Sequence, residues 1–185
     1  MENERLKFRM YFFVPYNISP IQQAIQAGHA ALEYALLYGK SQEFLDFASY
    51  DKTWIILNGG TTNDHLTQDK DGKIIYKGTL NQILNDLGKT EINYSFFREP
   101  DMNEALTAVC FLADERVWDY EKYPDFVDWF IGTLGYISAQ RTIEIKMLSI
   151  EDLKRNKTQY DAWVSFMGGE KNIFLRELIR GKRLA

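Results

Sequence analysis

Residues 19–38, SPIQQAIQAGHAALEYALLY, predict one amphipathic helix with a well-defined start. Ser19 is a favourable N-cap residue, and Pro20 suits the first helical position because a missing N–H costs nothing there. Gln22 stands at the third helical position, where it can complete a capping box with Ser19. An apolar segment that ends at Pro15 precedes the helix. The helix N-terminus, with its free N–H groups, is therefore expected at the end of a strand.

Two stripes of side chains follow the helical period within this stretch. The apolar stripe contains Ile21, Ala24, Ile25, Gly28, Leu32, Ala35 and Leu36. The polar stripe contains Gln22, Gln26, His29 and Glu33. A solvated face is the ordinary explanation of a polar stripe, and the residues alone favour it over a binding site.

Two apolar runs on either side of this helix predict neighbouring strands. Residues 7–14 (KFRMYFFV) are rich in aromatic side chains, and residues 53–57 (TWIIL) form a short apolar run between polar residues. A strand, a helix and a second strand in this order imply a right-handed crossover, so we expect the two strands to pair in parallel.

The polar residues 58–78 are interpreted as an insertion, with residues 73–77 as one arm of a hairpin. Thr79 is expected to cap a second helix. Residues 91–97 and 106–113 then predict two further strands. The predicted fold class is a three-layer α/β fold, with a mixed four-stranded sheet and helices on both faces.

Past the last predicted strand the pattern becomes helical. Ser149 and Asp152 are placed to form a capping box. The segments expected to be helical are 126–134, 150–155, 160–166 and 171–180. We interpret residues 1–117 as an α/β domain that includes the insertion. Residues 118–185 are interpreted as a helical appendage that packs on this core or makes a dimer contact.

The composition is that of a folded chain. Hydrophobic residues make up 45% and aromatic residues 15%, which excludes a disordered protein. The first ten residues are charged and do not resemble a signal peptide, and no segment approaches the roughly 20 apolar residues of a transmembrane helix. Cys110 is the single cysteine and cannot form an internal disulfide. We therefore expect a cytoplasmic protein with no membrane partner, in the host cytoplasm if a phage encodes it.

The formal net charge of −4 is unevenly distributed. Residues 141–185 contain ten Lys or Arg and six Asp or Glu, so the first 140 residues have a net charge of −8. The overall sign argues against indiscriminate binding of nucleic acid. A local basic surface toward the C-terminus stays open, although a solvated helical face is the commoner cause of such a bias.

Candidate chemistry is confined to one helix stripe and one loop. Two His and one Cys at no ligand spacing argue against a metal site, and we expect no cofactor. If the third predicted strand is parallel to the first, the loop at 98–104 lies at the sheet edge where the helix begins. The residues that would then face each other are Glu99, Asp101 and Asn103 from the loop and Gln22, Gln26 and His29 from the helix. A histidine beside a carboxylate can act as a general base or orient a substrate.

Each candidate also has an ordinary structural explanation. His29 can be a hydrogen-bonded helix histidine. Glu99 and Asp101 can belong to a turn before a short helical segment. Cys110, in the middle of a predicted strand, is explained as a small core residue.

With these residues laid out, the chain resembles the second family of peptidyl-tRNA hydrolases, found in archaea and eukaryotes, and a bacterial and phage branch of the same fold more closely. Residues 19–35 resemble the family's first helix, with its Gln-x-x-His-Ala core at Gln26, His29 and Ala30. Residues 53–57 are similar to its second strand. Residues 96–113 (FFREPDMNEALTAVCFLA) resemble its acidic loop and Thr-led last strand. The resemblance covers roughly residues 7–115.

The resemblance implies a mixed four-stranded sheet, often in a dimer, and hydrolysis of the ester that joins a peptide to the tRNA 3′ end. It assigns Gln26 and His29 to the pocket, Glu99 to the position of the family's catalytic aspartate, and Thr107 to the threonine beside the site. The chain departs from the pattern at Gln22, where the family has a lysine, and in its shorter Glu99-Pro100-Asp101 turn. The lysine would supply a cation able to hold a phosphate or stabilise an oxyanion.

Three hypotheses follow. The first is an esterase that acts on peptidyl-tRNA or a related aminoacyl or nucleotide ester. Glu99 and His29 would be its catalytic residues, and Gln22, Gln26, Asp101, Asn103 and Thr107 would bind substrate. The second is a catalytically silent protein of the same fold that holds a small nucleotide-like ligand or a protein. The third is an interaction module whose working part is the appendage. A homodimer is compatible with each.

Overall fold

The computed structural model describes residues 5–61, 65–68, 70–72, 74–135, 138–147, 152, 155 and 157–185. The chain divides into two units, one made of residues Met1–Ala113 and Leu178–Ala185 and the other of Asp114–Glu177. The helix and capping box expected around residue 150 lie outside the described residues, apart from Asp152 and Arg155.

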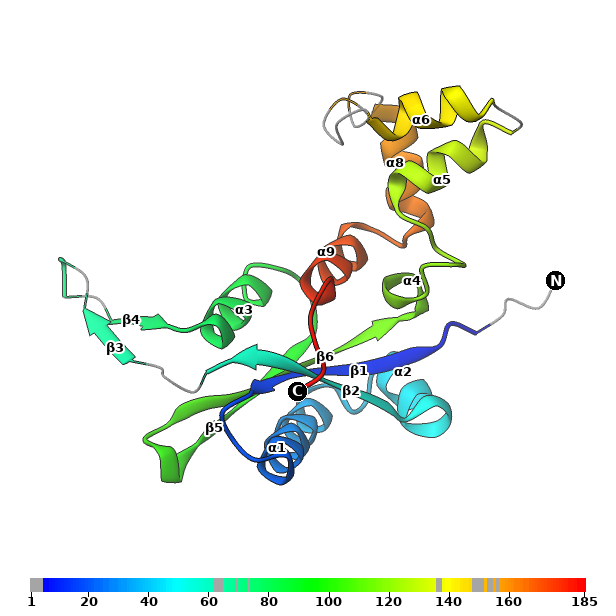
Figure 1. Ribbon diagram of the computed structural model, residues 1–185. Coiled ribbons are helices and arrows are strands. Elements are labelled where there is room, and N and C mark those ends of the chain that lie inside the picture. The colour runs from blue at the N-terminus through cyan, green and yellow to red at the C-terminus, as the bar shows by residue number, and fades with distance from the viewer. Residues whose placement is uncertain are drawn as a thin grey trace. The chain divides into compact units, whose positions relative to one another are not determined.

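The first unit is built on a four-stranded sheet (Figure 1). Its strands are β1 (Phe8–Pro15), β2 (Thr53–Gly60), β5 (Tyr94–Glu99) and β6 (Ala105–Asp114), and their order is β2-β1-β6-β5. β1 and β2 pair in parallel, with Phe12 opposite Ile56, whereas β5 and β6 pair antiparallel, with Phe96 opposite Val109. In Figure 1, β6 also runs opposite to β1. The sheet is therefore mixed, and β1 and β5 run in the same direction, as the placement of the loop required.

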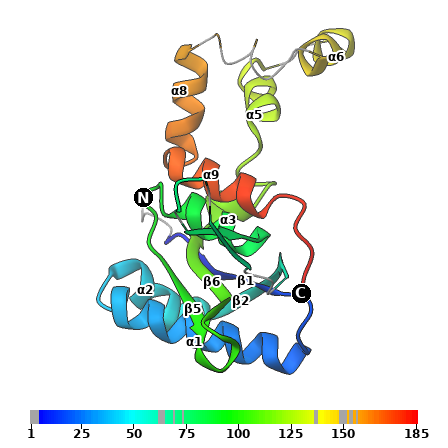
Figure 2. The same cartoon turned by 90° about the vertical axis from the view of Figure 1, so that its left-hand side faces the viewer.

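Helices cover both faces of this sheet, as predicted. Helices α1 (Pro20–Tyr38) and α2 (Gln42–Asp46) lie on one face, and α3 (Thr79–Leu87) lies on the opposite face (Figures 1 and 2). A π-helical turn, η1 (Phe47–Asp51), continues α2 and leads into β2.

The alternating side chains of β1 fill the space on both faces. Met10, Phe12 and Val14 belong to the core cluster on the α1 side. Tyr11 and Phe13 point the other way, and their rings contact that of Phe111 on β6, with centroids 5.9 and 6.2 Å apart. This alternation explains why nearly every residue of β1 is buried.

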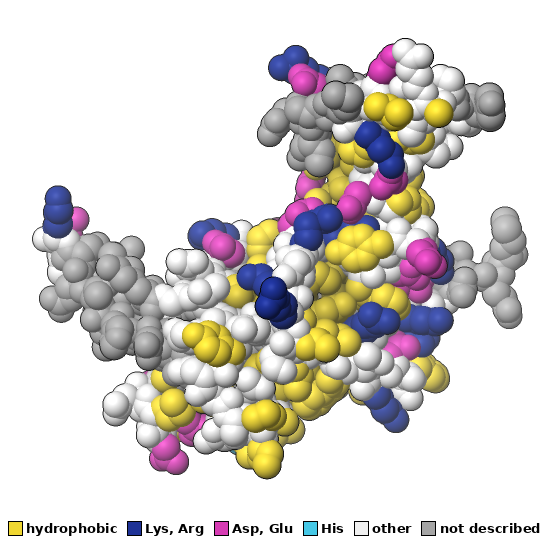
Figure 3. Space-filling model, in the orientation of Figure 1, with side chains coloured by type: hydrophobic (Ala, Val, Ile, Leu, Met, Phe, Trp, Pro, Cys, Tyr) yellow, Lys and Arg dark blue, Asp and Glu magenta, His cyan; other side chains and the backbone are white. Residues whose placement is uncertain are grey.

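The face of α1 that packs on the sheet is not the apolar stripe. The buried residues of α1 are Gln23, Gln26, Ala27, Ala30 and Tyr34. The apolar stripe faces solvent: Ile21 is 75% exposed, Leu32 65% and Leu36 81%. Large side chains of β1 already occupy the interior, so α1 approaches the sheet through its small alanines. Figure 3 shows hydrophobic side chains reaching the surface where α1 lies.

The insertion contains a hairpin, as predicted. Strands β3 (His65–Gln68) and β4 (Ile74–Lys77) pair antiparallel. The prediction that Thr79 caps α3 is wrong. Thr79 is the first residue of the helix, and Gly78 holds the N-cap position without a side-chain hydrogen bond.

The second unit is helical. Its helices are α4 (Glu115–Trp118), α5 (Phe126–Thr133), α6 (Ala139–Met147) and α8 (Lys157–Phe166), with α9 (Glu170–Ile179) up to Glu177. Phe126, Ile145, Trp163 and Met167 form its buried apolar cluster. Helices α5, α8 and α9 match predicted segments, whereas α4 and α6 were not predicted.

Residues at the C-terminal end of the described chain extend the sheet beyond β2. The Asn58 N–H donates to the Arg183 carbonyl oxygen at 2.9 Å, and the Ala185 N–H donates to the Ile56 carbonyl oxygen at 3.1 Å. Leu184 stands opposite Leu57 in an antiparallel bridge. This pairing covers the edge of β2 at residues 56–58, which would otherwise face solvent.

Candidate functional site

The start of α1 is fixed by side chains of its first turn. The Ser19 N–H donates to Gln22 Oε1 at 3.0 Å, and the Gln22 N–H donates to Ser19 Oγ at 3.3 Å, so the predicted capping box is present. Gln23 Nε2 donates to the Pro15 carbonyl oxygen at 3.0 Å, which ties the helix to the end of β1. The amide oxygen of Gln22 is therefore engaged at the helix cap.

Three predicted site residues form one hydrogen-bonded group. Thr107 Oγ1 on β6 donates to Gln26 Oε1 on α1 at 2.5 Å, and Gln26 Nε2 donates to Glu99 Oε2 at the end of β5 at 2.6 Å. Thr107 is fully buried and Gln26 is 7% exposed, whereas Glu99 is only partly buried. The group thus leads from the core to a carboxylate that reaches the surface.

The two partners of Gln26 together fix the orientation of its amide. A side-chain amide has one acceptor oxygen and one donor nitrogen. Because a carboxylate can only accept, the nitrogen of Gln26 is directed to Glu99, and the amide oxygen accepts from the hydroxyl of Thr107. A carboxylate that accepts a hydrogen bond from a largely buried amide is held in one position.

His29 lies one helical turn after Gln26, on the same face of α1. Its ring stacks on that of Phe97 on β5, with centroids 4.4 Å apart and an interplanar angle of 23°. His29 is partly buried. The imidazole is therefore positioned by an aromatic ring, and Phe97 is a site residue that the sequence reasoning missed.

Asp101 and Asn103 are exposed on the turn that follows Glu99. Asp101 lies in the 3₁₀ turn η2 (Pro100–Met102), and Asn103 adopts a left-handed conformation with φ of 54°. Within the described residues, the structure does not bring these two side chains into the hydrogen-bonded group of Gln26 and Glu99.

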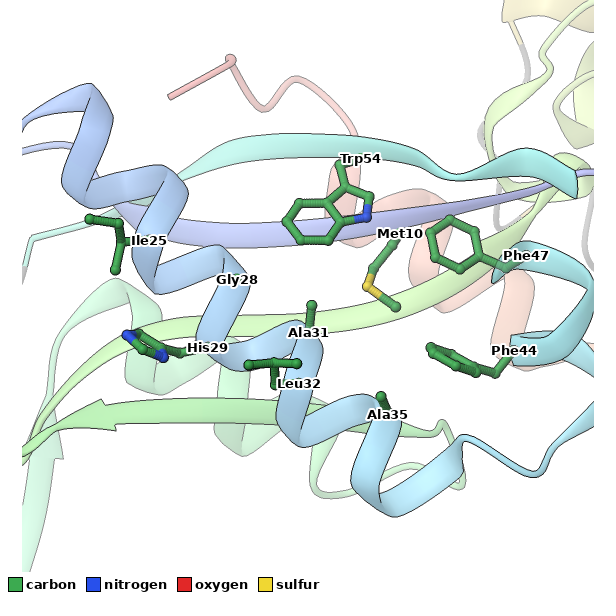
Figure 4. A pocket seen from close by; sticks show the side chains of 10 residues that line it. All are labelled: Met10, Ile25, Gly28, His29, Ala31, Leu32, Ala35, Phe44, Phe47 and Trp54. Carbon is green, nitrogen blue, oxygen red and sulfur yellow. The ribbon is translucent and has the colours of Figure 1, made fainter. Parts of the chain in front are cut away.

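An apolar groove, also missed from the sequence, begins at His29. It has a volume of about 510 Å³ and lies between α1, the α2–η1 segment and the strands β1 and β2 (Figure 4). Its lining residues are Met10, Ile25, Gly28, His29, Ala31, Leu32, Ala35, Phe44, Phe47 and Trp54. The signal that could have revealed it is the apolar stripe of α1, since Ile25, Gly28, Leu32 and Ala35 belong to that stripe and line the groove.

Cys110 is fully buried and takes no part in the site. Ser95 Oγ and Cys110 Sγ lie 3.1 Å apart, and burial raises the pKa of the Cys110 thiol to about 12. The thiol is therefore protonated at neutral pH, in agreement with its interpretation as a core residue.

The charged groups of the site are few. Helix α1 contains no Lys or Arg. In the part of the chain that the structure describes, no three His, Cys, Asp or Glu residues gather in a way that could hold a metal ion. The described helices also include none with both the length and the apolar character needed to cross a membrane. The site offers one carboxylate, one imidazole and amide groups beside an apolar surface.

Comparison with known proteins adds no relative to this description. No protein-family model matches the chain, and a search of curated proteins finds no match.

Proposed function

We propose that this protein hydrolyses the ester that joins an acylated amino acid or a peptide to the 3′ end of tRNA, or a related aminoacyl ester of adenosine. The observation that supports the proposal is the hydrogen bond from Gln26 to Glu99, which joins residues far apart in the sequence at one edge of the sheet. The resemblance to peptidyl-tRNA hydrolases assigns roles to these same residues.

Glu99 is the general base in this proposal. Its carboxylate takes a proton from a water molecule while the water oxygen attacks the ester carbonyl carbon. The bond between that carbon and the ribose oxygen then breaks, and the ribose oxygen takes up the proton. The step consumes one water and yields a free acylated amino acid and a free 3′ hydroxyl.

The other residues bind the substrate and orient the reacting groups. His29, held against Phe97, contacts the reacting ester, and Gln26 keeps Glu99 in place. Thr107 is a positioning residue, since it acts through Gln26. Asp101 and Asn103, on the exposed turn, contact the nucleotide part of the substrate, and Gln22 contributes its amide nitrogen at the first turn of α1.

A second candidate function is supported by the absence of Lys and Arg from α1. Without a cation on α1, the developing oxyanion has less electrostatic stabilisation from this helix, and loss of such stabilisation is worth 10²-fold or more in enzymes. The same site then binds an acylated nucleotide without cleaving it.

The test is release of N-acetyl amino acid from N-acetylaminoacyl-tRNA. We expect turnover by the wild-type protein and a loss of about 10²-fold or more in Glu99→Gln, because the amide cannot accept the proton. His29→Ala should also lose activity. Glu104→Gln is the matched control, since it makes the same exchange at an exposed position after the turn.

The outcomes separate the two functions. Full activity of Glu99→Gln would show that Glu99 is not the base. No turnover at high concentration of wild-type protein would reject hydrolysis. In that case, binding of 3′-(N-acetylaminoacyl)amino-adenosine, whose amide link resists cleavage, would test the silent binding protein.

A further inference from the structure

The groove that begins at His29 is almost wholly apolar. Of the side chains that line it, His29 alone has polar atoms apart from the indole N–H of Trp54. Figure 4 shows Phe44 and Phe47 at one end of the groove, His29 and Ile25 at the other end, and Trp54 and Leu32 between them. Its volume of about 510 Å³ lies within the range of small-ligand sites.

This lining selects the kind of group that fits. A nucleobase or a charged group placed in the groove would lose hydrogen bonds to water and find few partners, at a cost of about 1–3 kcal/mol for each group left unsatisfied. An aliphatic or aromatic group would lose no hydrogen bonds and would cover side chains that now face water. Among these, Ile25 is 50% exposed and Leu32 is 65% exposed.

The groove and the polar site share a helix and a residue. His29 lines the groove and stacks on Phe97, while Gln26, one turn earlier, donates to Glu99. Side chains three positions apart on a helix lie about 5–6 Å from each other at their Cβ atoms. One molecule of amino-acid size can therefore reach both places at once.

We propose that the groove holds the apolar side chain of the acylated amino acid whose ester group lies at Glu99 and His29. This proposal rests on the proposed function for its polar end. The preferred substrates are then esters of N-acylated amino acids with a large apolar side chain, such as phenylalanine. The nucleotide part of the substrate is directed away from the groove.

The experiment compares N-acetyl-phenylalanyl and N-acetyl-glycyl esters of adenosine. We expect kcat/KM to be at least about 10- to 200-fold higher for the phenylalanyl ester, since an apolar pocket gives this range for a single methylene and the two side chains differ by a benzyl group. Leu32→Asn should lower kcat/KM for the phenylalanyl ester and leave the glycyl ester unchanged. Leu37→Asn is the matched control, since Leu37 lies on the same helix, is 63% exposed and does not line the groove.

A binding measurement separates this proposal from the proposed function. N-acetyl-phenylalaninamide has no ester, so its binding to the Glu99→Gln protein, followed by NMR chemical shifts, does not depend on hydrolysis. Binding that is lost in Leu32→Asn and kept in Leu37→Asn supports the groove even if no ester is cleaved. Trp54 lines the groove and belongs to β2, so Trp54→Ala should weaken the same binding.

Two results would overturn the proposal. One is equal rates for both esters together with no effect of Leu32→Asn. The other is a dimer, seen by light scattering, that Leu32→Asn dissociates and Leu37→Asn does not, because a second copy of the chain would then occupy the groove.

Discussion

At the scale of single residues, the orientation of one amide determines what the site can do. Gln26 has its oxygen against Thr107 and its nitrogen against Glu99. If the amide were reversed, its oxygen would face the carboxylate, and two acceptors would repel each other. The carboxylate of Glu99 thus sets the orientation of the amide, and the buried hydroxyl of Thr107, which can donate or accept, donates to the amide oxygen.

Replacing Thr107 tests this arrangement. Thr107→Val keeps the shape but leaves the buried oxygen of Gln26 without its donor, so the free energy of unfolding should fall by about 1–3 kcal/mol. Urea denaturation measures the change. Thr107→Ser keeps the hydroxyl and should lose less. Equal losses in the two variants would mean that the hydrogen bond contributes little.

The raised pKa of Cys110 predicts how the stability of the protein depends on pH. Burial raises its pKa to about 12, whereas the exposed thiol ionises near pH 9. Between these values the folded state holds a proton that the unfolded state has released, so stability falls as pH rises above 9, by up to about 1.4 kcal/mol per pH unit. Cys110→Ala should decline less steeply between pH 9 and 10.5 in denaturation experiments. Parallel declines would contradict the assignment to Cys110.

Residue patterns predicted the polar part of the site better than the apolar part. Gln26 and Glu99 could be brought together on the condition that the third strand is parallel to the first, and the structure meets this condition. Phe97 and Trp54 could not be assigned, because their positions depend on which side chains the strands turn toward α1. Gln22 was predicted both as a cap residue and as a ligand of the substrate, and the structure engages its oxygen in the cap.

At the scale of elements, α1 shows how a helix can be predicted while its packed face is not. The period identifies a helix, but of its buried residues only Gln26 belongs to one of the two predicted stripes, and Gln23, Ala27, Ala30 and Tyr34 belong to neither. The volume left between the strands decides which face is buried, and this volume depends on Met10, Phe12 and other side chains outside the helix.

Two glycines distinguish open from filled space around these elements. An added Cβ at Gly28, in the middle of α1, meets no atom within 4 Å. Gly28→Ala should therefore raise the free energy of unfolding by about 0.5–1 kcal/mol through helix propensity. At Gly59 on β2 the added Cβ would lie 2.8 Å from Leu80 Cδ1 and 3.2 Å from the Val14 nitrogen. Gly59→Ala should destabilise by about 1–3 kcal/mol. Thermal or urea denaturation of both variants checks the opposite signs, and a loss in Gly28→Ala would contradict the open surroundings of that position.

At the scale of the whole molecule, the fold class followed from the order of strands and helices, and the division of the chain followed in part. The prediction placed residues 118–185 in one appendage, whereas Leu178–Ala185 belong with the sheet unit. The last residues, GKRLA, carry no strand pattern of their own. Their pairing with β2 is made by backbone atoms, which a pattern of side chains does not report.

The covered edge of β2 can be opened by one substitution. Ala185→Pro removes the N–H that the Ile56 carbonyl oxygen accepts. We expect a lower midpoint of thermal unfolding and faster growth of light scattering on heating, because exposed edges favour pairing between chains. Ala185→Ser keeps the N–H and serves as control. Identical scattering by both variants would show that the pairing does not protect the edge.

The position of β6 in the sheet has a consequence for the timing of folding. β6 lies between β1 and β5, yet it follows β1 in the sequence by about 90 residues. At synthesis rates of roughly 5–20 residues per second, β1 waits about 5–18 s on the ribosome before its central partner exists. During that time its apolar residues can be covered by α1, η1, β2 and α3, which precede β6 in the chain, but not by β6 itself. The time before β1 can pair with β6 is thus set by translation of the residues between them. A pause in translation before residue 105 would lengthen the exposure of β1.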